Sequence, residues 1–282
     1  MSQSVSHTFV LAGVMGWPIA HSRSPVIHGH WIELLGLRGS YVPLAVNPVH
    51  LPEALQGLAA LGFAGCNLTL PHKVDALTCI QELDDVARQI GAVNTVVVKA
   101  DGSLRGTNTD AFGYIQSLRE AQPDWQAASR PAVVLGAGGA ARAIVWALAD
   151  AGVKEIRLLN RSPDKANAMA TELGAPVKAL DWQDRHQALA DAGLLVNTTT
   201  QGMQGQPALD IDLSALPASA VVSDIVYTPL ETDLLRRAKQ RGNPVVNGLG
   251  MLLHQARPGF AAWFGVMPEV TPALWQKVIA TL

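Results

Sequence analysis

Cysteine is almost absent from this sequence of 282 residues, which contains only Cys66 and Cys79. The two residues are thirteen positions apart, and this spacing matches neither a redox motif nor a metal-binding motif. We therefore expect two free, buried thiols in a reducing compartment and no disulfide. His28 and His30 lie on opposite flanks of a predicted helix, which makes them a poor metal-binding pair, and we expect no bound metal.

Charged residues are also scarce, at 16% of the chain, and the formal net charge is -2 with no long block of lysine and arginine. We therefore expect no nucleic acid and no anionic membrane surface as partners. The longest apolar region, residues 131–152, is broken by Arg142 and by glycines, so it does not read as a membrane span. Residues 1–30 lack the pattern of a secretory signal, and we expect a cytoplasmic protein.

Hydrophobic residues are abundant, at 49%, and they alternate between strand-like and helix-like patterns. The length indicates about two domains, at roughly one for each 150 residues. In the first part, strands are expected at residues 8–15, 40–46 and 65–70, with helices at 25–35 and 51–61 between them. A β-hairpin is expected over residues 92–110, with Asp101-Gly102 as its turn. Later strands are expected at residues 132–135, 155–159, 194–197, 221–226 and 244–246. Helices are expected near the C-terminus. This order predicts an α/β protein with mostly parallel sheets.

A glycine-rich segment, "VVLGAGGAARAIVWAL", joins a predicted strand to a predicted helix. Gly136, Gly138 and Gly139 lie at this junction, where glycines let a pyrophosphate approach the backbone and the helix N-terminus supplies free amides. The segment therefore predicts a dinucleotide site, although a tight strand-to-helix turn without a ligand has the same pattern.

The end of the following strand carries "NRS" where NAD sites usually have an acidic residue. Asn160 offers no carboxylate to repel a phosphate, whereas Arg161 and Lys165 can bind the 2'-phosphate of NADP. We predict NADP as the cofactor. The alternative is that Arg161 and Lys165 are ordinary solvated charges at the start of a helix.

Two serines follow the first predicted strand in "HSRSP". Ser24 has the position of an N-cap residue before Pro25, which explains the pattern without any ligand. Ser22 and Ser24 beside a helix N-terminus can also hold a carboxylate by hydrogen bonds and backbone dipoles. Both interpretations stay open at this point.

In "NLTLPHK", residues 67–73, strand alternation places Asn67 and Thr69 on one face, with Leu68 and Leu70 directed into a core. Lys73 ends this segment, and Asp110 ends "GTNTD". A lysine paired with a carboxylate can deliver a proton to a ketone that a nicotinamide cofactor reduces. The competing interpretations are a solvated lysine and a helix cap at Asp110. His72 and His21 compete for the catalytic role.

Eight motifs, in order and over almost the full length, resemble the shikimate dehydrogenase family: "GWPIAHSRSP", "NLTLPHK", "GAVNT", "GTNTD", "LGAGGAARA", "NRSPDK", "NTTTQGM" and "NGLGMLLHQA". The resemblance implies NADP-dependent interconversion of 3-dehydroshikimate and shikimate on the route to chorismate and aromatic amino acids. It implies Lys73 and Asp110 as the catalytic residues. The substrate-binding residues that it implies are Ser22, Ser24, Thr69, Lys73, Asn94, Asp110, Tyr227 and Gln255. The cofactor-binding residues that it implies are Gly136, Ala137, Gly138, Gly139, Ala140, Asn160, Arg161, Ser162, Lys165, Ile225 and Gly248.

The resemblance also implies an architecture. We expect a substrate domain with a mostly parallel sheet over residues 1–112 and 249–282, and a Rossmann-like NADP domain over residues 113–248. The C-terminal helices are expected to return to the first domain. Both ligands are expected to meet in the groove between the two domains. Trp17 departs from the family's usual asparagine, and Ile225 and Ser162 replace its methionine and threonine. Pro258 is expected to bend the penultimate helix or to start a new one.

Two alternatives remain. A quinate/shikimate dehydrogenase is disfavoured because an NAD-using member is expected to have an acidic residue in place of Asn160. A catalytically silent NADP-binding sensor is disfavoured because Lys73, Asp110, Ser22 and Ser24 are all present. For the enzyme we expect a small-molecule substrate and a monomer or a homodimer.

Overall fold

The computed structural model describes residues 9–282 and divides into two compact units. Residues 1–8, which include the first residue of the expected strand 8–15 and the start of the expected first domain, lie outside the described residues. The described residues up to Thr109, together with Gln255–Thr281, form the first unit. Asp110–His254 form the second unit. Each unit is an α/β structure with its own six-stranded sheet, which confirms the predicted fold class.

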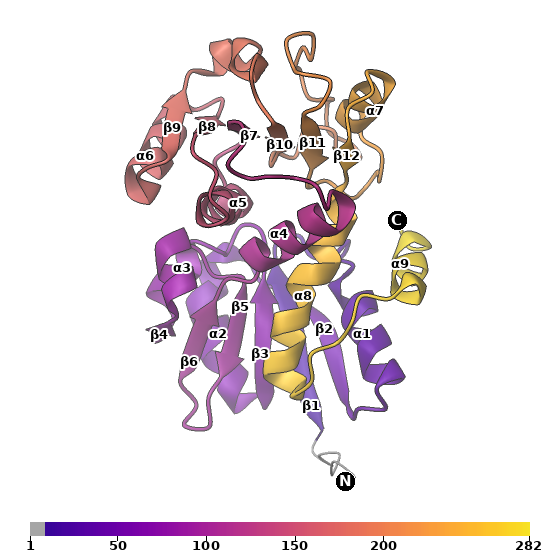
Figure 1. Ribbon diagram of the computed structural model, residues 1–282. Coiled ribbons are helices and arrows are strands. Elements are labelled where there is room, and N and C mark those ends of the chain that lie inside the picture. The colour runs from indigo at the N-terminus through magenta and orange to yellow at the C-terminus, as the bar shows by residue number, and fades with distance from the viewer. Residues whose placement is uncertain (1–8) are drawn as a thin grey trace. The chain divides into compact units, whose positions relative to one another are not determined.

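The first sheet has the strand order β2-β1-β3-β5-β6-β4 (Figure 1). Its strands are β1 (Val10–Gly16), β2 (Gly39–Ala45), β3 (Phe63–Leu68), β4 (Glu82–Leu83), β5 (Thr95–Val98) and β6 (Leu104–Thr107). β5 alone runs antiparallel to its neighbours β3 and β6, so it begins at the edge where β1, β3 and β6 end. The chain segments at this edge therefore come together.

Helices cover both faces of the first sheet. The helices that lie wholly in this unit are α1 (Ser24–Leu34), α2 (Leu51–Ala60), α3 (Asp85–Ile90) and α9 (Pro272–Ile279), with short 3₁₀ helices at Pro48–His50 and Asp75–Thr78. α2 buries Leu51, Leu55 and Leu58 against one face, because these positions recur at helical spacing. The other face packs against Trp263 of α8 (Gly248–Phe264), whose indole nitrogen donates to the Val96 carbonyl at 3.0 Å. The expected return of the C-terminal helices to this unit is confirmed.

The second sheet is wholly parallel and has the order β12-β11-β10-β7-β8-β9. Its strands are β7 (Ala132–Leu135), β8 (Ile156–Leu159), β9 (Val177–Leu180), β10 (Leu194–Asn197), β11 (Val221–Asp224) and β12 (Val245–Val246). Its helices are α4 (Asp110–Ala121), α5 (Gly139–Asp150), α6 (Pro163–Leu173) and α7 (Asp233–Gln240), with 3₁₀ helices at Trp182–Arg185 and Gln187–Leu189. A parallel sheet that is buried on both faces requires continuous apolar strands such as "AVVL".

Two cores lie on opposite faces of the second sheet. Val134 and Leu158 pack on the side of α4, α5 and α6, whereas Val133 and Leu135 pack on the side of α7. Successive residues of one strand thus enter different cores, as the alternation of a strand requires. This is the doubly wound arrangement that the Rossmann-like prediction implies.

The structure differs from the sequence patterns at one strand and one side chain, and it narrows the expectation for one proline, for which a bend had been the other expected outcome. The sequence patterns did not reveal β9, an edge strand of four residues. Leu70 is not in the core, because β3 ends at Leu68 and the Leu70 side chain is 61% exposed. α8 continues through Pro258 as one helix, so the proline does not start a new one.

Candidate functional site

The predicted substrate residues of the first unit lie in segments at one edge of its sheet. Ser22 and Ser24 follow β1, and Thr69 and Lys73 follow β3, which is the parallel neighbour of β1. The two segments are in contact, since the amide of Trp17 donates to the Leu70 carbonyl at 3.1 Å. Carboxyl ends of parallel strands are where α/β sheets bind ligands, so this edge is the candidate substrate site.

The serine pair does not have the cap geometry that the sequence pattern predicts. Arg23 has the N-cap position, and Ser24 is the first residue of α1. The Ser22 hydroxyl accepts a hydrogen bond from the Ser24 amide at 3.3 Å. Ser22 therefore satisfies one of the free amides at the start of the helix, and the assignment of Ser24 as N-cap is corrected.

Asn94 joins three segments of this edge. Its side-chain oxygen accepts hydrogen bonds from the Thr109 amide and from the Thr95 hydroxyl, both at 2.8 Å. The Thr109 hydroxyl in turn donates to the Gln255 carbonyl at 2.8 Å. Asn94 and Thr109 are both buried. This network fixes the backbone at Asn94 and Gln255, two of the predicted substrate residues.

Asn67, one residue before the end of β3, and Tyr41, in the middle of β2, extend this network, although neither was named among the predicted substrate-binding residues. The Tyr41 hydroxyl donates to the Asn67 side-chain oxygen at 2.6 Å, and the Asn67 amide donates to the Asn94 carbonyl and to the Thr95 hydroxyl. Burial raises the pKa of Tyr41, and a hydrogen bond with Ser24 opposes this effect. The polar face of "NLTLPHK" was the available signal for Asn67, whereas the position of Tyr41 depends on strand pairing that the sequence does not show.

The two histidines that compete with Lys73 lie in different environments. His72 is buried, and its Nε2 donates to the Val46 carbonyl at 2.9 Å. Burial lowers the pKa of His72, and the Nε2 donor of the ring is already used by the Val46 carbonyl. His21 is exposed on the segment after β1, and Lys73 is partly buried just after β3. Of the three residues, Lys73 combines partial burial with an ammonium group that can donate a proton.

Asp110 and Tyr227 belong to the second unit. Asp110 is fully buried at the first position of α4, directly after Thr109 in the chain. Tyr227 is partly buried, three residues after β11 ends. Gln255 belongs to the first unit and is partly buried within α8.

The glycine-rich segment has the geometry that a pyrophosphate requires. Gly136 follows β7 with φ +110°, and a Cβ there would lie 2.5 Å from the Thr198 hydroxyl. Gly138 is the N-cap residue of α5, and a Cβ there would meet no atom within 4 Å. Gly139, Ala140 and the neighbouring Ala137 complete the turn into a helix whose first amides have no capping side chain from Gly138. This open space beside free amides fits a phosphate group.

The adenosine side of the predicted cofactor site lies between β8 and α6. Asn160 follows β8, and its side-chain amide donates to the Ser162 carbonyl at 3.0 Å. Ser162 is the N-cap residue of α6. Arg161 and Lys165 are exposed, and within residues 9–282 neither forms an ion pair. These two cations at a helix start fit the 2'-phosphate of NADP.

The remaining predicted residues, Ile225 and Gly248, lie just after β11 and β12. Ile225 directly follows Asp224, the last residue of β11. Gly248 approaches this segment so closely that a Cβ would lie 2.0 Å from the Ile225 carbonyl oxygen. Asp224 is buried beneath the segment, and burial raises its pKa to about 6.

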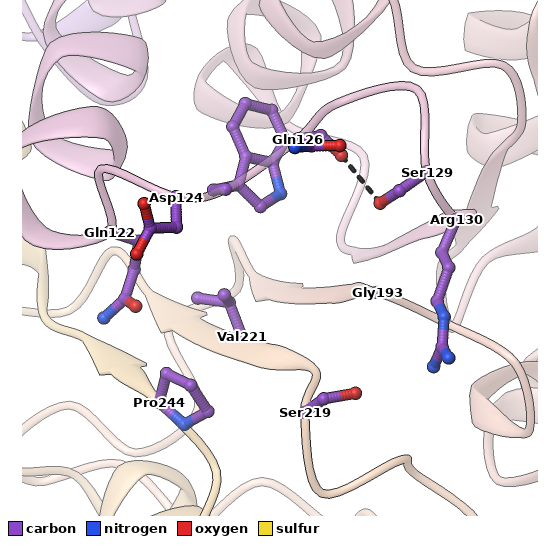
Figure 2. Close-up of a pocket in the computed structure, with 10 residues that line it drawn as sticks. Gln122, Asp124, Gln126, Ser129, Arg130, Gly193, Ser219, Val221 and Pro244 are labelled. Atoms are coloured by element: carbon purple, nitrogen blue, oxygen red, sulfur yellow. Dashed lines mark hydrogen bonds between the residues drawn. The ribbon is translucent and has the colours of Figure 1, made fainter.

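A pocket of about 370 Å³ lies elsewhere in the second unit, and Figure 2 shows its lining residues. Arg130, Gly193 and Pro244 come just before β7, β10 and β12, so this pocket is at the amino ends of the strands. The glycine-rich turn is at their carboxyl ends. None of the predicted site residues lines the pocket, and we assign it no role.

Within residues 9–282, no group of three His, Cys, Asp or Glu residues is arranged to hold a metal ion. In the same part of the chain, no helix combines the length and the apolar character needed to cross a membrane. Cys66 and Cys79 are both free, Cys66 buried and Cys79 only partly so, which corrects the expectation that both are buried.

Comparisons with known proteins agree with this geometry. Residues 14–96 match a family described as "Shikimate dehydrogenase substrate binding domain", and residues 119–204 match one described as "Shikimate / quinate 5-dehydrogenase". A protein of Paramagnetospirillum magneticum named "Shikimate dehydrogenase (NADP(+))" is 58% identical over 96% of this chain and 98% of its own length.

Solved structures are also similar over almost the whole chain. Shikimate 5-dehydrogenase of Thermus thermophilus, in complex with NADP(H) and shikimate, has a TM-score of 0.86 and 37% identity over 97% of this chain and 100% of its own. Quinate dehydrogenase of Corynebacterium glutamicum, in complex with NAD, has a TM-score of 0.88 and 30% identity over 97% of this chain and 99% of its own.

Proposed function

Because this chain belongs to the shikimate dehydrogenase family, we propose that it catalyses the reversible, NADP-dependent reduction of 3-dehydroshikimate to shikimate. The observation that carries the proposal is the near full-length match to NADP-dependent relatives, at 58% identity in one case. The exposed Arg161 and Lys165 beside α6 support NADP as the cofactor. The reaction places the enzyme on the route to chorismate and aromatic amino acids.

The first unit binds the substrate in this proposal, and the second unit binds NADP. Ser22 and Ser24 hold the substrate carboxylate at the N-terminal end of α1. Thr69, Asn94 and Gln255 contact its hydroxyl and carbonyl groups. The network around Asn94 supports these roles, because hydrogen bonds already hold its side chain and the backbone of Gln255.

The chemical step uses the two predicted catalytic residues. When bound, NADPH supplies a hydride to the keto carbon. Lys73 donates a proton to the carbonyl oxygen as it becomes a hydroxyl, and it accepts that proton back in the oxidative direction. Asp110 is the second catalytic residue in this proposal. Tyr227 is the remaining substrate-binding residue in the second unit.

In this proposal, different parts of NADP bind at the ends of different strands of the second sheet. Gly136, Gly138 and Gly139, with Ala137 and Ala140, cradle the pyrophosphate at the N-terminus of α5. Asn160, Arg161, Ser162 and Lys165 bind the adenosine and its 2'-phosphate. Ile225 and Gly248 complete the binding surface beyond β11.

A quinate dehydrogenase activity is the second candidate, because the similar Corynebacterium glutamicum structure is a quinate dehydrogenase. An assay of the purified protein distinguishes the two candidate activities. It combines NADPH or NADH with 3-dehydroshikimate or 3-dehydroquinate and compares the rates of the four pairs. Our proposal expects the fastest loss of NADPH absorbance with 3-dehydroshikimate. Faster turnover of the quinate pair with NADH favours the second candidate, and turnover of no pair contradicts both.

The compartment and the assembly are further parts of the proposal. The free cysteines and the biosynthetic reaction support a cytoplasmic enzyme. We propose a monomer or a homodimer that needs no other protein, nucleic acid or membrane for activity. Light scattering coupled to gel filtration measures the assembly, and a larger stable oligomer contradicts this part.

A further inference from the structure

Asp224 is a buried carboxylate to which the proposed mechanism gives no role. It is the last residue of β11, it is 1% exposed, and its register partner on β10 is Asn197. Both residues therefore lie at the carboxyl edge of the second sheet, where the chain turns into the segments that the cofactor is proposed to contact. A buried carboxylate is costly unless it accepts several hydrogen bonds.

Three donors from three segments converge on this carboxylate. One oxygen accepts from the Asn197 side-chain amide and from the Val226 amide, both at 3.0 Å. The other oxygen accepts from the Thr232 hydroxyl at 2.7 Å. Thr232 is itself the N-cap residue of α7. Asp224 thus fixes the turn after β11 at both of its ends.

Asn197 extends the network into the segment after β10. Its side-chain oxygen accepts from the Thr199 amide at 3.0 Å and from the Thr199 hydroxyl at 2.8 Å, and its amide also donates to the Gln201 carbonyl. The neighbouring Thr198 packs beside Gly136 of the glycine-rich turn. The network therefore reaches from α7 to the edge of the proposed pyrophosphate site.

The strand order indicates which part of the cofactor lies over this network. With the pyrophosphate at the end of β7 and the adenosine at the end of β8, the other half of a dinucleotide extends over β10 and β11. That half carries the nicotinamide ring, which must be placed accurately for hydride transfer because a displacement of about 1 Å can cost about 100-fold in rate.

We propose that Asp224 is a positioning residue for the nicotinamide half of NADP, because its carboxylate ties the segment after β10 to the segment after β11. The inference rests on the proposed function for the identity of the cofactor. Asp224 does not contact the reacting atoms in this view. It acts through Asn197 and Val226, which hold the surface on which the ring lies.

The test compares Asp224→Ala, Asp224→Asn and the control Asn243→Ala. Asn243 is also buried in the second unit, and its amide donates to the Pro217 and Ala220 carbonyls just before β11 begins, at the opposite edge of the sheet. All variants are characterised by thermal melting, by NADPH binding and by steady-state kinetics. Emission anisotropy of bound NADPH reports the mobility of the nicotinamide ring independently of turnover.

We expect Asp224→Ala to lower kcat by about 10- to 100-fold and to lower the anisotropy of bound NADPH. The NADPH dissociation constant is expected to change by less than about threefold. Asp224→Asn is expected to recover most of the lost turnover, because its amide oxygen can still accept from Asn197 and Val226. Asn243→Ala is expected to melt earlier and to keep the wild-type kcat and anisotropy.

If folded Asp224→Ala keeps the wild-type kcat and the wild-type anisotropy of bound NADPH, the inference is overturned. It is also overturned if Asn243→Ala loses as much kcat as Asp224→Ala. If Asp224→Ala does not fold, Thr232→Val replaces it, and an unchanged anisotropy in that variant overturns the inference. A wild-type protein that binds NADPH but reduces no substrate contradicts the proposed function only. In that case the anisotropy comparison still decides the role of Asp224.

Discussion

Replacement of His28 by phenylalanine is expected to make the protein less sensitive to acid. His28 is fully buried in α1, and its ring stacks on Tyr41 with 3.8 Å between centroids and an interplanar angle of 1°. Neither ring nitrogen has a hydrogen-bond partner among the described residues. Burial lowers the pKa of His28 from 6.5 to about 3. The ring therefore stays neutral in the folded state at pH values where the unfolded chain binds a proton.

The size of the effect follows from proton linkage. Between pH 6.5 and pH 3, His28 binds more protons in the unfolded state than in the folded state. The contribution of the neutral His28 ring to the free energy of unfolding is therefore complete above pH 6.5 and is lost as the pH falls. At pH 5 the unfolded imidazole is almost fully protonated and the folded one is not, which costs about 2 kcal/mol relative to pH 8. Phenylalanine cannot bind a proton, and it keeps an aromatic ring against Tyr41.

Urea unfolding at pH 8 and pH 5, followed by tryptophan fluorescence and circular dichroism, measures the free energy of unfolding of wild type and His28→Phe. The difference between the two proteins should shift by about 2 kcal/mol in favour of the variant at the lower pH. His50→Phe, at an exposed position, controls for the general loss of a histidine and should follow the wild-type pH dependence. An unchanged difference at the two pH values refutes the buried, neutral state of His28.

Three further predictions concern the proposed site. Lys73→Ala should lose about 10² to 10⁴ in kcat with little change in NADPH affinity, and unchanged turnover removes Lys73 from the mechanism. Arg161→Ala should raise the KM for NADPH and leave that for NADH nearly constant, since only NADPH has the 2'-phosphate, so equal effects on both contradict the assignment. Gly136→Ala should lower the free energy of unfolding by about 1 to 3 kcal/mol, because φ is +110° and the new Cβ meets Thr198. Gly138→Ala, with open space at its Cβ, is the control in the same urea experiment, and equal losses in both contradict the steric reason.

The sequence predicted the elements that have strong local patterns. The strand at 132–135 and the helix after it were found because four apolar residues precede three glycines. β9 was missed because it has four residues at a sheet edge, where burial on one side leaves little hydrophobic pattern. The start of α1 was displaced by one residue, since Ser24 has a cap-forming side chain but Ser22 accepts from its amide.

Much of the candidate site depends on contacts between distant segments. The Tyr41–Asn67 hydrogen bond joins residues on two strands that are not neighbours, with β1 between them. The Asp224–Asn197 hydrogen bond requires the parallel register of β10 and β11. A motif identifies the residue types, but the pairing of side chains follows from the sheet order. For this reason neither Tyr41 nor Asp224 could be assigned a partner from the sequence.

The hairpin of β5 and β6 has a practical consequence for attaching probes to the protein. Its open end provides Asn94 and Thr109, whereas its closed end, at Asp101 and Gly102, is exposed at the other end of the same two strands. The Ser103 amide and hydroxyl both donate to the Asp101 carboxylate, so the turn is held by its own residues. Exposed loop tips of this kind tolerate insertions. A peptide tag or a dye attachment site placed there leaves the network around Asn94 untouched and offers a fixed point for immobilising the protein on a surface.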